Sequence, residues 1–347
     1  MKYLSKAATH ILFQNITMDD TVIIAPLNWG LGHAARCIPI IHHLKTICKK
    51  VIIASDGQAL ELLQKEFQEL TSYELPGYKI KYRFDNMIIN IILQLPAIIM
   101  TYWKENHAAK NIVKQTKATI IISDSRFGFR ATSTKNIYLS HQINILHSNQ
   151  TVAYIANKLH LWVIRKFDDC WIPDYGYNNA LAGSLSNADH LKKKSYIGPV
   201  TRIIKMNIPL VWDICVLLSG PEPQRSVLEQ KLIIELKLLT SYKILFVRGI
   251  NDPDISSFKL SHVICKGLLT SDEISTALNS SRLLIARSGY TTVMDIESLD
   301  IQAIFIPTPG QTEQEYLASR LSSLPRYSCI LQSETSKLKK LIPVLLS

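Results

Sequence analysis

TVIIAPLNWGLGHAAR, residues 21–36, joins an apolar run to a glycine-bearing loop and then to a helical pattern. Strand, glycine loop and helix in this order are typical of the first unit of a doubly wound α/β sheet. Glycines let the backbone approach a ligand closely, and the start of the helix offers unpaired N–H groups to an anion. We therefore expect the loop around Gly30 and Gly32 to bind a phosphate or a carboxylate.

The same pattern continues along the chain. Short Val/Ile-rich runs alternate with helical patterns in VIIASDG (51–57), TIIISDS (119–125), NIYLSHQ (136–142) and DCWIPD (169–174). The pattern restarts at Asp213 and continues in KILFVRG, SHVICKG, RLLIARSG and QAIFIPTPG. Continuous apolar strands between helices indicate parallel sheets that are covered on both faces. The predicted fold class is α/β, with two Rossmann-like domains facing a central cleft.

Proline positions and the restart of the pattern suggest the domain boundaries. Pro199 and Pro209 lie between the two series of strands. We expect a flexible leader at 1–20, a first domain at 21–205 and a second domain at 210–325. The tail, 326–347, is expected to form a helix that packs back on the protein.

Composition narrows the class of protein. The chain has 347 residues, of which 47% are hydrophobic and 19% charged, so it can bury two ordinary cores. The net charge of +11 is concentrated in residues 1–200, which hold 23 lysines and arginines against 14 aspartates and glutamates. This excess fits either an anionic surface or substrate, or a solvated face that keeps the protein soluble. The basic residues form no stripe interleaved with aromatics, which disfavours nucleic-acid binding.

Cysteine spacing and the N-terminal sequence favour a cytoplasmic protein. The six cysteines include no C-x-x-C pair, so neither a zinc knuckle nor a disulfide framework is indicated. The first twenty residues are too polar for a secretory signal.

MIINIILQLPAIIM, residues 87–100, is too short to span a bilayer. It has two interpretations. A buried core helix kinked at Pro96 is slightly favoured. The alternative is a peripheral membrane contact through 87–104, because Tyr102, Trp103 and Lys104 suit a headgroup layer. The second interpretation would place the protein at the inner face of the cytoplasmic membrane.

The loop after the first strand also suggests chemistry. His33 and Arg36 lie three positions apart at the start of a helix, where a histidine can take a proton from a hydroxyl and an arginine can hold an anion. A competing interpretation is a nicotinamide-dependent oxidoreductase, because Gly30, Gly32 and Ala35 match G-x-G-x-x-A and Asp56 follows about twenty residues later.

Two stretches in the second half point to a nucleotide sugar. ARSGYTTVMDIESL (286–299) and IPTPGQTEQEYLASRL (306–321) each lead from a strand through a loop into a helix. Amides at the helix starts can hold a diphosphate, and the carboxylates and amide side chains that follow can pair with sugar hydroxyls.

RSGYTTVMDIESL followed by IPTPGQTEQEYLA resembles the C-terminal donor domain of family 28 glycosyltransferases, and NWGLGHAAR is similar to the glycine-rich acceptor loop of the same superfamily. The resemblance implies a GT-B fold, with an acceptor-binding first domain and a donor-binding second domain. It implies inverting transfer of a hexosyl or N-acetylhexosaminyl group from a UDP-sugar to a hydroxyl. The acceptor would be lipid-linked or a cell-envelope glycan, and neither a metal nor another cofactor is expected. A UDP-sugar epimerase or hydrolase on the same fold and a non-catalytic partner subunit stay open as alternatives.

The residues and the resemblance together assign the site. His33 is expected to be the catalytic base, and Arg225 or Arg287 to stabilise the departing UDP. The family's ribose-binding glutamate falls on Asp295, and its paired glutamines fall on Gln314 and Glu315. The expected donor-binding residues are Ser219, Gly220, Gln224, Arg225, Arg287, Ser288, Gly289, Thr292, Asp295, Gln311, Gln314 and Glu315. The expected acceptor-side residues are Asn28, Gly30, Gly32, Arg36, Asp124, His141 and Gln142.

Overall fold

The computed structural model describes residues 14, 16–78, 87–147, 149–176, 179–250, 260–299 and 301–347, and for 87–93 the backbone alone. The chain forms two compact units, one with the described residues up to Asn28 and His33–Thr201, the other with Trp29–Gly32 and Arg202–Ser347. Most of the expected leader lies outside the described residues. Ile16 is buried, and the carbonyl of Asp20 accepts a hydrogen bond from the N–H of Lys49, so residues 16–20 belong to the first unit.

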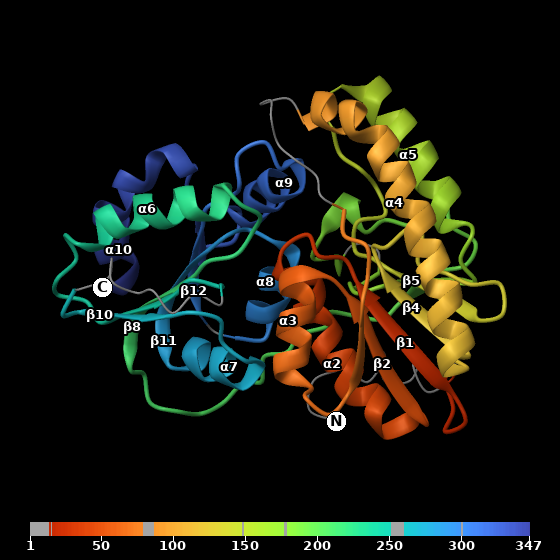
Figure 1. Ribbon diagram of the computed structural model, residues 1–347. Helices are drawn as coiled ribbons and strands as arrows, with labels where there is room; N and C mark the ends of the chain where they lie inside the picture. The colour runs from red at the N-terminus through yellow and green to blue at the C-terminus, as the bar shows by residue number, and fades with distance from the viewer. Residues whose placement is uncertain are drawn as a thin grey trace. The chain divides into compact units, whose positions relative to one another are not determined.

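The first unit is built on a parallel sheet with the strand order β3-β2-β1-β4-β5-β6-β7 (Figure 1). Its central strands are buried along their whole length, which explains their unbroken Val/Ile runs. The strands are β1 (Thr21–Pro26), β2 (Lys50–Ser55), β3 (Thr71–Glu74), β4 (Ile120–Asp124), β5 (Lys135–Leu139), β6 (Asp169–Ile172) and β7 (Ser195–Tyr196).

Helices connect these strands and cover the sheet. They are α2 (Leu31–Ile47), α3 (Gly57–Glu66), α4 (Met87–Thr116) and α5 (Gln150–Ile164), with a short 3₁₀ turn, η2 (Gly183–Leu185). The last turns of α4 belong to the core, because Ala109, Ile112 and Val113 pack with Ile23 and Ile121 of the sheet.

The earlier half of α4 corrects the favoured interpretation of the apolar stretch at 87–100. The helix continues through Pro96, and the described side chains from 94 to 104 are exposed or half-buried. Leu95, Ile99, Met100 and Trp103 are between 47% and 64% exposed. This part of α4 is therefore not a buried core helix.

The second unit repeats the architecture with a parallel sheet in the order β10-β9-β8-β11-β12-β13. Its strands are β8 (Trp212–Leu217), β9 (Ile244–Val247), β10 (Val263–Lys266), β11 (Ser281–Ala286), β12 (Gln302–Phe305) and β13 (Tyr327–Cys329). Its helices are α6 (Gln224–Leu236), α7 (Ser271–Asn279), α8 (Tyr290–Glu297), α9 (Thr312–Leu321), the 3₁₀ helix η4 (Gln332–Lys337) and α10 (Leu338–Leu346).

Residues 326–347 belong to this second unit. β13 pairs with β12, and Leu338, Ile342 and Leu346 of α10 pack in one core with Ile214 and Val216 of β8. The structure therefore extends the second domain beyond residue 325, to Ser347.

The strand order of each sheet indicates where a ligand site is expected. In each sheet the first strand of the unit lies between the second and the fourth, so the connections run in opposite directions on either side of it. Ligands of such sheets bind at the carboxyl ends of the strands at this reversal point. The reversal lies between β1 and β4 in the first unit, where Pro26 is aligned with Asp124, and between β8 and β11 in the second.

Candidate active site

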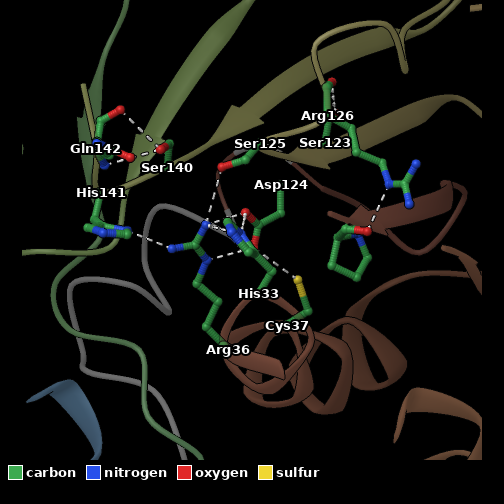
Figure 2. A network of polar contacts seen from close by, with 12 residues as sticks. His33, Arg36, Cys37, Ser123, Asp124, Ser125, Arg126, Ser140, His141 and Gln142 are labelled. Carbon is green, nitrogen blue, oxygen red and sulfur yellow. Dashed lines mark hydrogen bonds and ion pairs between the residues drawn. The ribbon is translucent and has the colours of Figure 1, made fainter. Parts of the chain in front are cut away.

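His33 and Asp124 form the centre of a polar network at the reversal point of the first sheet (Figure 2). His33 lies in the first turn of α2, and Asp124 is the last residue of β4. Nδ1 of His33 is 2.8 Å from Oδ1 of Asp124. Asp124 is fully buried, whereas the His33 side chain is 18% exposed. A histidine that is partly open to solvent and held from behind by a carboxylate is arranged as a general base usually is.

Arg36, one turn further along α2, completes the network. Its Nε donates to Oδ2 of Asp124 at 2.6 Å, and a second nitrogen forms an ion pair with Oδ1. It also donates to Nδ1 of His141 at 2.7 Å and lies 2.8 Å from Nδ1 of His33. The side chain is 1% exposed. Arg36 is therefore part of the support of His33, which corrects the expectation that it faces an acceptor anion.

The network keeps His33 neutral. Burial lowers the pKa of His33; Asp124 acts against this shift, while the charge of Arg36 adds to it. Burial alone would raise the pKa of Asp124, but the ion pair with Arg36, together with the hydrogen bond from His33, holds it well below its usual range. At neutral pH the site therefore holds an ionised aspartate, a charged arginine and an uncharged imidazole.

Asn28 and Asp56 are engaged in a second network on the other side of β4. Nδ2 of Asn28 donates to Asp56 at 3.2 Å, and Asp56 forms an ion pair with Arg126. Arg126 also binds Glu105 at 2.8 Å and the carbonyl of Pro26. The carboxylate of Asp56 is thus engaged by protein groups, which argues against its expected part as a ribose-binding acid in the oxidoreductase alternative.

Sequence reasoning missed Arg126 and Glu105. The available signal was the position of Arg126 two residues after Asp124 at a strand end. Ser125 between them has a φ of 57°, a left-handed conformation that is uncommon for residues other than glycine. Figure 2 shows the side chains of Asp124 and Arg126 on opposite sides of this turn.

The other expected acceptor-side residues lie near His33 in the chain or on the next strand. Gly30 has a φ of 86°, and Gly32 lies within the first turn of α2. His141 follows β5 and accepts the hydrogen bond from Arg36. The N–H of Gln142 donates to Ser140 Oγ at 3.1 Å, which fixes the turn after β5.

In the second unit, the loop between β8 and α6 contains Ser219 and Gly220. Gly220 has a φ of 107°, which only glycine adopts readily. Gln224 is the first residue of α6, and its side-chain oxygen accepts from Gln332 at 3.0 Å. The loop thus ends at a helix start, as an anion site requires.

Neither arginine that was expected to stabilise the departing UDP is open for direct contact with it. Arg225 is bound to the carboxylates of Glu222 and Glu229, so it is not available to a diphosphate. Arg287 is buried and donates to neutral oxygens, which are the carbonyls of Gln224, Ile306 and Pro307 and the side-chain oxygen of Gln332. It joins the loops of the second unit to each other, and burial lowers its pKa to about 10.

The turn after β11 and the helix α8 hold four further donor-binding candidates. Gly289 is the N-cap of α8, and a Cβ built on it would meet no atom within 4 Å. The hydroxyl of Ser288 donates to the carbonyl of Gln314 at 2.8 Å, and Thr292 is half-buried in the first turn of α8. Asp295 is 3% exposed and lies 3.8 Å from Nε of Arg202. The carboxylate of Asp295 is therefore not exposed for the contact with ribose that was expected of it.

Gln311, Gln314 and Glu315 fix the loop before α9. Gln314 donates to Gln311 at 2.6 Å and accepts from the N–H of Thr308 at 2.8 Å, and Glu315 accepts from the N–H of Gly310 at 2.9 Å. Glu315 also borders a half-open cavity of about 310 Å³, whose other lining residues are Lys231, Pro307, Pro309, Leu331, Gln332 and Ser333.

Among the residues that the structure describes, no three histidine, cysteine, aspartate or glutamate side chains are grouped as a metal site would need. In the same part of the chain, no helix combines the length and the apolar content needed to cross a bilayer.

The similarity to known proteins agrees with this arrangement. Residues 224–347 match the family model described as the glycosyltransferase family 28 C-terminal domain. The chain is a glycosyltransferase related to family 28. This glycosyltransferase is 26% identical, over 267 residues, to the UDP-N-acetylglucosamine--N-acetylmuramyl-(pentapeptide) pyrophosphoryl-undecaprenol N-acetylglucosamine transferase of Buchnera aphidicola, covering 70% of this chain and 68% of the relative. The enzyme of the same name from Amoebophilus asiaticus is 22% identical over 338 residues, which are 91% of this chain and 87% of the relative.

Solved structures show the same fold. The glycotransferase of kitacinnamycin has a TM-score of 0.67 at 10% identity, covering 95% of this chain and 91% of the other. MurG of Acinetobacter baumannii has a TM-score of 0.54 at 15% identity, with the same coverage. The glycosyltransferase thus has the GT-B fold of two Rossmann-like domains, which confirms the predicted fold class. None of these similarities supports the oxidoreductase alternative.

Proposed function

We propose that the protein transfers a hexosyl or N-acetylhexosaminyl group from a UDP-sugar to a hydroxyl of a lipid-linked acceptor, with inversion and without a metal. The observation that carries the proposal is the pairing of His33 with a buried carboxylate in a chain whose residues 224–347 match a family 28 donor domain. The relatives named above act on a UDP-sugar and a pyrophosphoryl-undecaprenol, and this substrate class is the one we assign.

In the proposed reaction, Nε2 of His33 takes the proton of the acceptor hydroxyl. The hydroxyl oxygen attacks the anomeric carbon, and the bond from that carbon to the β-phosphate oxygen breaks as UDP leaves with the bonding electrons. A general base contributes about 10²- to 10⁴-fold to the rate of such a step. The imidazolium that forms is stabilised by Asp124, which lies 2.8 Å behind it.

The tautomer of His33 decides whether this step can occur. The carboxylate of Asp124 only accepts hydrogen bonds and Arg36 only donates them, so Nδ1 of His33 bonds to one of the two at a time. When Nδ1–H donates to Asp124, Nε2 has a free lone pair and acts as the base. The reactive form is therefore the one in which His33 bonds to Asp124 rather than to Arg36.

The donor is proposed to bind the second domain through main-chain amides. We assign the diphosphate to the loops that lead into α6 and α8, after Gly220 and Gly289, because the N-terminal ends of helices favour anions. In α6 the N–H groups of Arg225 and Ser226 already donate to Pro221 and Glu222, so the N–H of Gln224 and the helix dipole are what this end offers the ligand. Arg287 adds a buried positive charge beneath these loops, and its hydrogen bonds go to neutral oxygens. Its contribution to the departing UDP is thus electrostatic, without direct contact.

A donor panel tests the function. Purified protein is incubated with UDP-N-acetylglucosamine, UDP-glucose or UDP-galactose, with and without a lipid extract of bacterial membranes, and UDP release is measured. We expect release with one donor, only when the lipid fraction is present, and a radiolabelled sugar in the lipid product. Release that is independent of acceptor would support a hydrolase, and conversion of the donor into another UDP-sugar without release would support an epimerase. A lack of release with every donor and acceptor would contradict the proposal.

We also propose that the first domain touches the membrane that carries such an acceptor, from the cytoplasmic side. The exposed residues of α4, namely Leu95, Ile99, Met100 and Trp103, are followed by Lys104. Exposed apolar side chains beside lysines suit the headgroup layer of anionic lipids.

A second helix of the same domain supports the membrane proposal. On α5, Tyr154, Ile155, Leu159 and Trp162 are between 53% and 63% exposed. Lys158 lies over the ring of Tyr154 and Lys166 over the ring of Trp162. The six described cysteines are free, as a reducing cytoplasm allows.

Vesicle flotation tests the membrane contact. The protein should float with vesicles of phosphatidylcholine and phosphatidylglycerol, and the pair of substitutions Ile99→Ser and Trp103→Ser should reduce the bound fraction severalfold. Leu238→Ser is the matched control, because Leu238 is equally exposed but lies in the second domain. Equal flotation of all three proteins would contradict a contact through α4.

A further inference from the structure

Thr308 has a buried hydroxyl that the fold does not use. The residue follows β12 and is 2% exposed. Among the described residues, no hydrogen-bond partner meets its Oγ1. Buried hydroxyl groups in folded proteins are nearly always hydrogen-bonded, because an unpaired one loses its interaction with water and gains nothing in return. The hydroxyl of Thr308 is therefore able to donate a hydrogen bond to a group from outside the chain.

The backbone holds this hydroxyl in a fixed direction. Thr308 lies between Pro307 and Pro309, whose rings restrict the main chain. Its N–H donates to Oε1 of Gln314 at 2.8 Å, and the carbonyl of Pro307 accepts from Arg287 at 3.1 Å. A hydroxyl positioned in this way is ordered before any ligand arrives, so little entropy is lost when a ligand binds it.

The hydroxyl faces the loop before α6. A Cβ built on Gly220 would have Oγ1 of Thr308 as its nearest neighbour, at 4.0 Å. The space that a side chain would fill at Gly220 is thus bordered by this hydroxyl. A glycine at a phosphate-binding turn serves to keep such a space open for the ligand.

The neighbouring hydroxyl, that of the expected donor-binding residue Ser288, is already engaged. Oγ of Ser288 donates to the carbonyl of Gln314 at 2.8 Å, within the same group of loops. Arg287 connects the loop of Thr308 to the start of α6, because it donates to the carbonyls of Pro307 and Gln224. Arg287 thus connects the loop that carries the unpaired hydroxyl to the start of α6.

We propose that Thr308 is a donor-binding residue whose Oγ1 donates a hydrogen bond to a diphosphate oxygen of the UDP-sugar at the start of α6. This assignment rests on the proposed function. The hydroxyl is covered by protein atoms, so the diphosphate reaches it through a small displacement of the Gly220 loop. The hydrogen bond formed there replaces the interaction that the hydroxyl lacks in the fold.

The test compares Thr308→Val with Thr308→Ser. Valine has nearly the shape of threonine but no hydroxyl, whereas serine keeps the hydroxyl. Titration calorimetry with UDP should show the dissociation constant raised roughly tenfold in Thr308→Val, the loss expected for one hydrogen bond to a charged group, and nearly unchanged in Thr308→Ser. Differential scanning calorimetry should show the second domain of Thr308→Val melting at the same temperature as the wild type or about 2 °C higher, because an unpaired buried hydroxyl is gone.

The outcomes separate this proposal from the function on which it rests. Wild-type protein that binds UDP while Thr308→Val binds it equally well overturns the assignment of Thr308 and leaves the proposed function standing. Weaker binding accompanied by a lower melting temperature in both variants also overturns it, because a structural role would then explain the loss. Wild-type protein that binds no UDP overturns the proposed function, and this assignment with it.

Discussion

The carboxyl edges of the two sheets have the same strand order at the reversal point but differ in electrostatics. At the first edge, the charge of Arg36 is compensated by the buried carboxylate of Asp124. At the second edge, Arg287 is equally buried, but its hydrogen bonds go to carbonyl and amide oxygens. One edge is therefore a neutral network around an imidazole, and the other has a positive charge beneath glycine loops.

This difference shows how one fold can serve two tasks. A proton-accepting histidine needs surroundings that keep it uncharged, and a compensated ion pair provides them. A diphosphate needs positive charge and N–H groups that are not already neutralised by the protein. The strand order places both sites at reversal points, whereas the pairing of the buried arginine decides which chemistry each site supports.

The largest effect on turnover is expected when His33 is removed from the carboxyl edge of the first sheet. His33→Ala should lower kcat by about 10²- to 10⁴-fold, because the proton acceptor is lost, while UDP affinity stays within twofold of the wild type. In the wild type, the acid limb of kcat/KM should lie below pH 6.5, because burial lowers the pKa of His33. Steady-state kinetics across pH and UDP titration measure these effects, and a turnover close to that of the wild type would remove His33 from catalysis.

A large loss of stability is expected when a buried charge of the first domain loses its partner. Arg126→Ala leaves the carboxylates of Asp56 and Glu105 without their cation, which should cost about 3–5 kcal/mol in the free energy of unfolding. Lys45→Ala, which removes a surface ion pair with Glu69, should cost less than about 1 kcal/mol. Urea unfolding followed by circular dichroism measures the free energy of unfolding of both variants. Equal losses would contradict the argument that burial makes the ion pairs of Arg126 more important than the surface pair of Lys45.

Acidification should lower the free energy of unfolding of the first domain by about 3 kcal/mol more than that of the second. Burial lowers the pKa of His160, in the first domain, to about 4. The unfolded chain takes up the proton near pH 6.5, so this stability is present above pH 6.5 and is lost as the pH falls toward 4. Calorimetry from pH 7 to pH 4 should show the first domain losing stability faster than the second. The slope should become smaller in His160→Phe, and an unchanged slope would assign the effect to other groups.

A smaller effect is expected at the second edge. Gly220→Ala places a side chain on a backbone with φ of 107°, which should cost about 1–2 kcal/mol and weaken UDP binding without moving the acid limb of kcat/KM. Gly289→Ala is the matched control for strain, because Gly289 has a φ of −71°. Calorimetry should find a smaller loss in Gly289→Ala, where only the preference of the N-cap for glycine over alanine is lost, and an equal loss in both variants would contradict the strain argument.

The sequence predicted the parts of the fold that depend on continuous burial. The strands at the centre of both sheets have unbroken apolar runs, and these were found. β3, β7 and β13 were missed, because TSYE, SY and YSC are short and contain polar residues, and they pair at or near the edges of the sheets. The exposure of α4 was misjudged, since an apolar run has the same composition whether it faces a core or solvent.

The sequence identified the residues of the candidate site better than it identified the groups that these residues contact. His33, Arg36 and Asp124 were selected, but Arg36 was expected to face a ligand and instead binds Asp124. Arg225 was misjudged in the same way, because its direction depends on Glu222 and Glu229. The ion pairs of Arg126 join segments 21 and 70 positions away, and only the strand order brings these segments together.

The position of α10 in the core has a consequence for how the protein emerges from the ribosome. The first sheet is complete once residue 196 has been synthesised, but the core of the second domain needs Leu338, Ile342 and Leu346. Domains generally fold as units, in the order of their synthesis. Until α10 has been synthesised, the second domain therefore has an apolar sheet face that α6 covers only in part. A chaperone would be most useful during this interval.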